Sequence, residues 1–217
     1  MSRYWGIRVG NGWGFKFTEF TSTEASNIVG MPSTLLGLWR GRGQVSGGRG
    51  NCGTFDARQL AELMIKYELS KCGVSPSDSA EVSCKAAQIA LFFALLNSEG
   101  TCEAIGTQAD TQRFIERFSN DTSVAAMLTA KPELYQFLVV SSDGNVSFHK
   151  ELTDGLLALG STRPGYVISL QEAARDLATG ARRPLFTVDV SGDTPEPIIR
   201  QVTCGRNLDE TRPNISF

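Results

Sequence analysis

The chain has little of what metal centres and membrane anchors require. It contains a single histidine, His149, and its five cysteines show no CxxC spacing. We therefore expect no zinc site of the common cysteine and histidine types, and no cofactor. The most apolar stretch, residues 86–96, is about half as long as a membrane-spanning helix, and the N-terminus has no signal-peptide pattern. These absences predict a cytoplasmic protein with reduced thiols and no membrane contact.

The signatures of nucleotide-binding and hydrolytic enzymes are also missing. The glycines of residues 10–14 lack dinucleotide-loop spacing, and the glycine-rich stretch 47–53 has no lysine for a Walker motif. No motif ties His149 to a nucleophile or a carboxylate. Cys52 lies near Arg49, where a cation would favour the thiolate, so a redox sensor is the reactive alternative. We expect that the protein is not an enzyme.

Basic and acidic residues are nearly equal in number overall, but they are unevenly distributed along the chain. The 217 residues include 21 basic and 23 acidic side chains, a formal charge of −2. Residues 1–50 contain six basic and two acidic residues (+4), and the remainder contains 15 basic and 21 acidic residues (−6). Because basic segments attract phosphate, the first quarter of the chain is the expected nucleic-acid-facing part.

Local patterns predict an α+β fold that is mostly helical. Alternation around a glycine turn predicts a hairpin or a mobile arm at the N-terminus. Spacing and capping signals predict helices over residues 21–29, 32–43, 55–71, 80–97, 111–118, 123–130, 152–159 and 169–178. Strands are predicted over residues 134–140, 145–149, 166–168 and 184–190. Helices followed by mixed elements indicate an α+β fold or two subdomains.

The order of these elements divides the chain into five predicted segments. They are an arm or hairpin (1–19), a winged helix-turn-helix (20–75), a helical dimerisation region (76–131), a small α/β module (132–191) and an extended tail (192–217). The helix over 80–97 is apolar almost all round. It is therefore either covered by a second subunit or buried in the core of one chain, and both interpretations stay open.

The second segment carries the functional prediction. A short capped helix, a turn at Gly30, a second short helix, a glycine-rich stretch and a longer amphipathic helix follow in order. This is the order of a winged helix-turn-helix, in which the second helix enters the major groove and the wing follows the flanking backbone.

Short motifs in the same segment add a resemblance. Val29-Gly30-Met31 stands at the turn, Trp39-Arg40-x-Arg42-Gly43 ends the second helix, and Phe55-Asp56-Ala57-Arg58 begins the third. In order and spacing these motifs resemble the MerR-like winged helix-turn-helix domain, particularly its phage and prophage-type members. The resemblance implies a transcriptional regulator that binds double-stranded DNA as a homodimer. In such proteins the C-terminal region supplies the dimer contact and sometimes an effector site, so a small-molecule effector is left open.

Five residues are the predicted DNA contacts. Arg40 and Arg42 in the second helix and Arg49 in the wing are placed to meet phosphate. Ser33 and Thr34 stand at the start of that helix, where N–H groups favour anions, although simple capping is the alternative role for their hydroxyls.

The second helix also departs from the family pattern. Leu36, Gly37, Leu38 and Gly41 stand where polar or basic residues are usual, which leaves few donors for reading bases. Either shape, phosphates and the wing supply specificity, or the helix contacts protein through Leu36 and Leu38. The alternative function is therefore a protein-interaction or phage-assembly module that uses the same fold without binding DNA.

Overall fold

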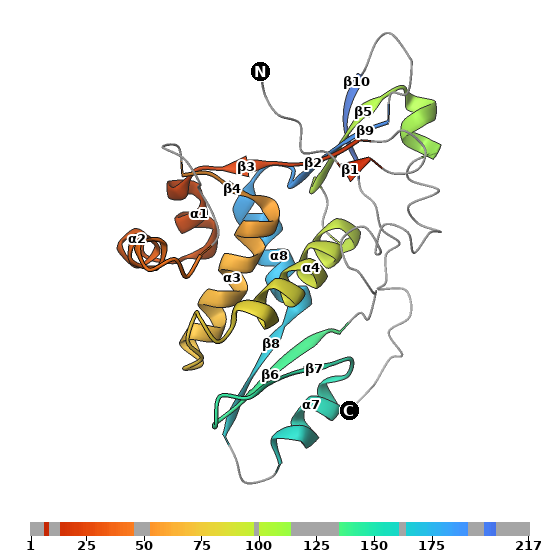
Figure 1. Cartoon of the computed structure of the whole chain (residues 1–217). Helices are drawn as coiled ribbons and strands as arrows, with labels where there is room; N and C mark the ends of the chain where they lie inside the picture. Colours follow the sequence, from red (N-terminus) through yellow and green to blue (C-terminus); the bar gives the residue numbers. More distant parts are fainter. Residues whose placement is uncertain are drawn as a thin grey trace.

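The computed structural model describes residues 7–8, 14–45, 53–97, 100–113, 135–160, 164–190 and 198–202. Within these residues the fold is α+β, with a group of packed helices between two sheets (Figure 1). The described helices are α1 (Ser22–Val29), α2 (Ser33–Gly41), α3 (Ala57–Lys71), α4 (Ala80–Asn97), α7 (Leu152–Leu159) and α8 (Leu170–Ala181). Residues 108–113 are also helical, and the predicted helix over 123–130 lies outside the described residues.

Capping groups fix the helix boundaries near the N-terminus. The Thr21 Oγ1 accepts from the Glu24 N–H, and the Glu24 carboxylate accepts from the Thr21 N–H, so the predicted capping box is confirmed. Gly30 ends α1 with φ of +67°. The third helix does not begin at Phe55 as predicted. Phe55 is in a strand and Asp56 caps α3 through the N–H of Gln59, so the helix starts two residues later.

A five-stranded sheet joins distant parts of the chain. Its order is β1 (Ile7–Arg8), β2 (Gly14–Phe17), β9 (Phe186–Asp189), β5 (Cys102–Gly106) and β10 (Ile198–Val202). The predicted N-terminal hairpin is confirmed by the β1–β2 pairing. The β9 strand is parallel to β5 and antiparallel to β2. One sheet therefore combines strands from four of the five expected segments.

Two of these strands correct the sequence predictions. The chain over residues 102–106 is a strand inside the region expected to be helical, and alternate burial there matches a strand with one covered face. Residues 198–202 lie in the expected extended tail, yet they pair antiparallel with β5. Pairing partners far away in sequence decide both elements, so local patterns do not reveal them.

The remaining strands form two smaller sheets. The β3 strand (Glu19–Phe20) pairs with β4 (Phe55–Asp56) and joins the chain before α1 to the chain before α3. The β6 (Phe137–Ser141), β7 (Val146–His149) and β8 (Gly165–Ser169) strands form an antiparallel sheet in the order β7-β6-β8. This sheet, with α7 against it, lies at the end of the molecule opposite the five-stranded sheet (Figure 1).

The core is formed mainly by α3, α4 and α8. Most of the apolar side chains of α4 are buried within one chain, including Ala86, Ile89, Leu91, Phe93 and Leu95. The apolar character of α4 is thus explained by the monomer core, and these side chains are not available for the predicted dimer contact. In addition, α8 packs against α1, α3 and α4, and β9 lies in the main sheet. Residues 132–191 are therefore not a separate module, because only β6, β7, α7 and β8 form the small sheet unit.

Candidate nucleic-acid interface

A tight turn sets the relationship between α1 and α2. The hydroxyl of Ser26 donates to the carbonyl of Met31, and the Met31 N–H donates to the Ser26 carbonyl. Gly30, with its positive φ, allows the chain to reverse between them. Ser26 and Met31 are both buried, so this pair of bonds holds the second helix at a defined angle to the first.

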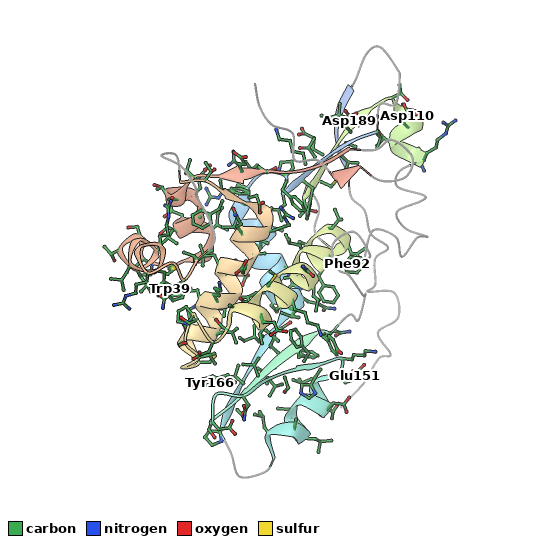
Figure 2. The ribbon with its side chains drawn as sticks, viewed as in Figure 1. Trp39, Phe92, Asp110, Glu151, Tyr166 and Asp189 are labelled. Atoms are coloured by element: carbon green, nitrogen blue, oxygen red, sulfur yellow. The ribbon has the colours of Figure 1, made fainter. Side chains whose placement is uncertain are left out.

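The α2 helix has one buried and one exposed face. Leu36 and Trp39 are buried, and the Trp39 ring meets the Tyr67 ring of α3 edge-on with centroids 6.5 Å apart. Figure 2 shows Trp39 between α2 and α3, where its side chain is part of the core. The solvent face consists of Ser33, Thr34, Gly37, Leu38, Gly41 and Arg42. Leu36 is only 2% exposed, so the expected Leu36 and Leu38 surface is wrong, and only Leu38 is available to a partner.

The N-terminus of α2 is open. Pro32 is the N-cap residue, and no side chain caps the helix. The capping role considered for Ser33 and Thr34 is therefore wrong, and both side chains are exposed. Because the first-turn N–H groups are directed outward along the helix axis, this end of α2 favours an anion such as phosphate.

Arg40 is held inside the fold. Its Nη1 donates to the Oγ of Ser22 at 2.6 Å, and Ser22 in turn donates to the carbonyl of Gly53 at 2.6 Å. The guanidinium also lies over the ring of Phe55, with its carbon 5.7 Å from the ring centroid. A methyl group at Gly53 would lie 2.7 Å from Arg40 Nη2, and the positive φ of +49° at Gly53 also favours glycine there. Arg40 thus connects α1, α2 and the chain entering β4.

Arg42 differs from Arg40 although the two are close in sequence. It is exposed at the C-terminal end of α2, and none of the described residues makes a hydrogen bond or an ion pair with its side chain. Between Ala25 and Phe55 the sequence contains three arginines and no acidic residue. The exposed face of α2 is therefore cationic, and Arg42 is its one charged side chain among the described residues. Arg49 and Cys52 lie outside the described residues.

A C-terminal arginine stabilises the same region, which local patterns did not predict. Arg183 donates to the carbonyl of Glu19 at 2.7 Å and forms an ion pair with Glu24 at 3.1 Å. Its guanidinium lies 4.5 Å above the centroid of the Phe20 ring. Hydrogen bonds from the Thr21 backbone and side chain, with a smaller contribution from Arg183, lower the pKa of Glu24. In the sequence, only the capping signal at Thr21 and Glu24 indicated an ordered start of α1, and nothing nearby indicated the contact with Arg183.

The other chemistry-bearing residues do not form a second site of this kind. Among the described residues, no group of three or more acidic, histidine or cysteine side chains is arranged to hold a metal ion. His149 is half-buried, with its Nε2 atom 2.8 Å from the Ser147 hydroxyl. Cys102 is buried, and desolvation raises the pKa of Cys72. No described helix has both the length and the apolarity needed to cross a bilayer.

Comparison with known proteins adds no assignment. No family model and no curated protein sequence matches the chain.

Proposed function

We propose that the protein is a cytoplasmic DNA-binding transcriptional regulator that acts as a homodimer and is not an enzyme. In this proposal α1 and α2 form the helix-turn-helix, and residues 44–54 form the wing. The α2 helix enters the major groove of double-stranded DNA. The order of elements and the resemblance of residues 20–75 to MerR-like regulators both support this function.

The main observation in support of this proposal is that α2 has one buried face and one exposed face. Its inner face buries Leu36 and Trp39, α2 packs against α1, and the Trp39 ring meets the Tyr67 ring of α3. Its other face is exposed, carries no acidic side chain and ends in Arg42. An α-helix with a small, cationic outer face fits a major groove about 12 Å wide.

The proposed contacts are mostly to phosphate. The open N-terminus of α2, with Ser33 and Thr34, binds one backbone phosphate, and Arg42 binds another. Gly37 and Gly41 present no side chain to the groove, and nothing lies within 4 Å of a methyl group added at either. Few base contacts are then possible, so sequence preference comes from DNA shape and from the wing.

A second candidate function rests on Leu38. This side chain is 47% exposed in the middle of the outward face of α2. With Gly37 and Gly41 beside it, the face also suits a small apolar pocket on a protein partner. The alternative is therefore a protein-interaction or phage-assembly module without DNA binding.

Fluorescence anisotropy with the full-length protein distinguishes the two functions. The full chain is used because α8 and Arg183 contact the α1 and β3 region. Mixed-sequence and genomic duplexes are titrated at several salt concentrations. We expect the logarithm of the binding constant to fall linearly with the logarithm of the salt concentration, because phosphate contacts release counterions.

Two variants test whether α2 makes the contact. Leu38→Glu places a negative charge on the outward face and should abolish duplex binding, whereas Glu81→Gln on the exposed surface of α4 is the control and should leave binding unchanged. If the wild-type protein does not bind duplexes at low salt, the regulator proposal is wrong and the partner module is favoured.

A further inference from the structure

The exposed large apolar side chains of the described residues are concentrated in one region. There are six of them, and Leu38 on α2 is the only one outside this region. The other five are Leu152, Leu156 and Leu157 on α7, and Tyr166 and Val167 on β8. We refer to these five residues as the α7–β8 surface. It lies away from α2, at the opposite end of the molecule from the five-stranded sheet (Figure 1).

The α7 helix rests on the sheet through a glycine. Gly155 is its buried residue, and a methyl group added there would lie 2.7 Å from Val139 Cγ2. Leu159, one turn further on, also packs against the sheet, beside Gly165 of β8. Leu156 and Leu157 follow Gly155 by one and two positions and so point to other sides of the helix, where they are 51% and 77% exposed.

The neighbouring β8 strand is an unpaired edge. In the order β7-β6-β8, one side of β8 pairs with β6, and no described strand pairs with the other. The Leu170 N–H donates to the Gln136 carbonyl and extends this ladder. Because hydrogen-bonded pairs alternate along antiparallel strands, the N–H and C=O of Val167 point to the open edge.

The open edge of β8 is largely apolar, and Pro164 stands directly before the strand. The strand sequence is GYVIS, which contains no charged residue and no proline. In natural edge strands, lysine, proline or a bulge commonly prevents pairing with another chain. An apolar edge strand without these features can pair with a further strand. Tyr166 is 56% exposed at this edge (Figure 2).

We propose that the α7–β8 surface binds a second copy of this chain. The β8 strands of two protomers pair antiparallel about a two-fold axis through Val167, and the two three-stranded sheets become one six-stranded sheet. In this arrangement each Val167 exchanges both backbone hydrogen bonds with its counterpart. The exposed leucines of the two α7 helices then flank the joined strands.

The chemistry of the surface favours a second copy over another protein. An antiparallel pairing of identical strands is self-complementary, as a two-fold interface requires. The five side chains are uncharged, so none of them repels its counterpart in a second copy. A stable interface buries about 1,200–2,000 Å² in total, so the exposed leucines of α7 must contribute area beside the paired strands.

The burial of the apolar side chains of α4 also favours the α7–β8 surface as the dimer interface. The helix expected to make the dimer contact uses its apolar side chains in the core of one chain. A dimer must therefore use other residues, and the α7–β8 surface is the largest apolar group available among those described. This inference rests on the homodimer of the proposed function and names its interface, but it does not depend on DNA binding, because the surface lies away from α2.

Solution mass is the first test. The full-length wild-type protein should show twice its 23.5 kDa mass by light scattering at micromolar concentration. A Leu156→Glu and Leu157→Glu double variant should show the monomer mass with an unchanged circular dichroism spectrum, because both side chains are exposed. Leu38→Glu adds a charge at an exposed leucine elsewhere and should remain dimeric.

Cross-linking tests the strand register directly. A Val167→Cys variant should form an intermolecular disulfide on mild oxidation, because paired Cα atoms about 5.5 Å apart suit a disulfide. Ser147→Cys on the opposite edge strand is the control, and peptide mapping by mass spectrometry separates the new bond from native cysteines. A monomeric wild-type protein, a dimeric double variant, or a Val167→Cys protein without a bond between the two introduced cysteines would overturn the proposal. Duplex binding measured separately keeps this outcome distinct from that of the proposed function.

Discussion

The guanidinium of Arg40 donates to the hydroxyl of Ser22 at 2.6 Å, and that hydroxyl donates to Gly53. One hydrogen-bond chain thus connects the end of α2, the start of α1 and Gly53, two residues before β4. Arg40 and Arg42 carry the same charge two residues apart, yet the first is engaged within the fold and the second is exposed. Their substitutions should therefore have different consequences.

Replacing Arg42 should weaken DNA binding to all sequences by a similar factor. Loss of one phosphate contact in Arg42→Ala should reduce the slope of log K against log salt by about 1. Anisotropy titrations on several duplexes measure this slope. Arg175→Ala is the matched control, because Arg175 is an exposed arginine on α8, and its slope should equal that of the wild type. An unchanged slope for Arg42→Ala would exclude Arg42 as a phosphate contact.

Replacing Arg40 should instead lower stability. Arg40→Lys keeps the charge but loses the planar fork that reaches Ser22 and covers Phe55. We expect a loss of about 1–2 kcal/mol in the free energy of unfolding, as for other bonds to charged groups. Urea unfolding measures it. Arg42→Lys should stay within about 0.5 kcal/mol of the wild type as the exposed-site control. Equal effects of the two substitutions would contradict the internal role of Arg40.

Glycine-to-alanine changes should distinguish an open helix face from a packed one. Nothing lies within 4 Å of a methyl group at Gly37, so Gly37→Ala should stabilise the protein by about 0.5–1 kcal/mol through helix propensity. A methyl group at Gly180 in α8 would lie 3.0 Å from Ile28 Cγ2, so Gly180→Ala should not give this gain. Thermal unfolding measures both. Destabilisation by Gly37→Ala would show that this face of α2 is covered.

The capping box should make stability depend on pH in a defined range. The lowered pKa of Glu24 means that its carboxylate stabilises the folded state above the ordinary glutamate pKa. This contribution is lost as the pH falls from about 5 through the lowered pKa in the folded state. Urea unfolding between pH 2.5 and pH 7 should show a smaller decline for Glu24→Gln, which keeps a capping side chain without the titrating charge. Identical pH profiles would contradict this role.

The sequence predicts the elements whose signals are local. The capping groups Thr21 and Ser169 and the turn glycines Gly30 and Gly144 stand within a few residues of the backbone they organise. The helix over Ala80–Asn97 is confirmed at both ends for the same reason. The exposed position of Arg42 is likewise consistent with its predicted place on the second helix.

Long-range contacts account for what the sequence did not predict. The β5 and β10 strands become strands through pairing partners about 95 residues apart, a relationship that spacing along the chain does not encode. Arg183 reaches Glu19 across 164 residues. The roles of Leu36 and Leu38 were also open in the sequence, because their burial depends on how α2 packs against the rest of the chain.

By itself, the sequence determined an α+β chain with a basic first quarter and a short helix, a turn and a second helix within it. Capping, glycine conformation and apolar spacing act over a few residues, so they can be read locally. The tertiary structure alone decided that α4 belongs to the core, that Arg40 supports the fold while Arg42 faces solvent, and that α7 exposes its leucines. Each of these outcomes depends on which distant surface covers a residue, and burial is a property of the packed chain as a whole.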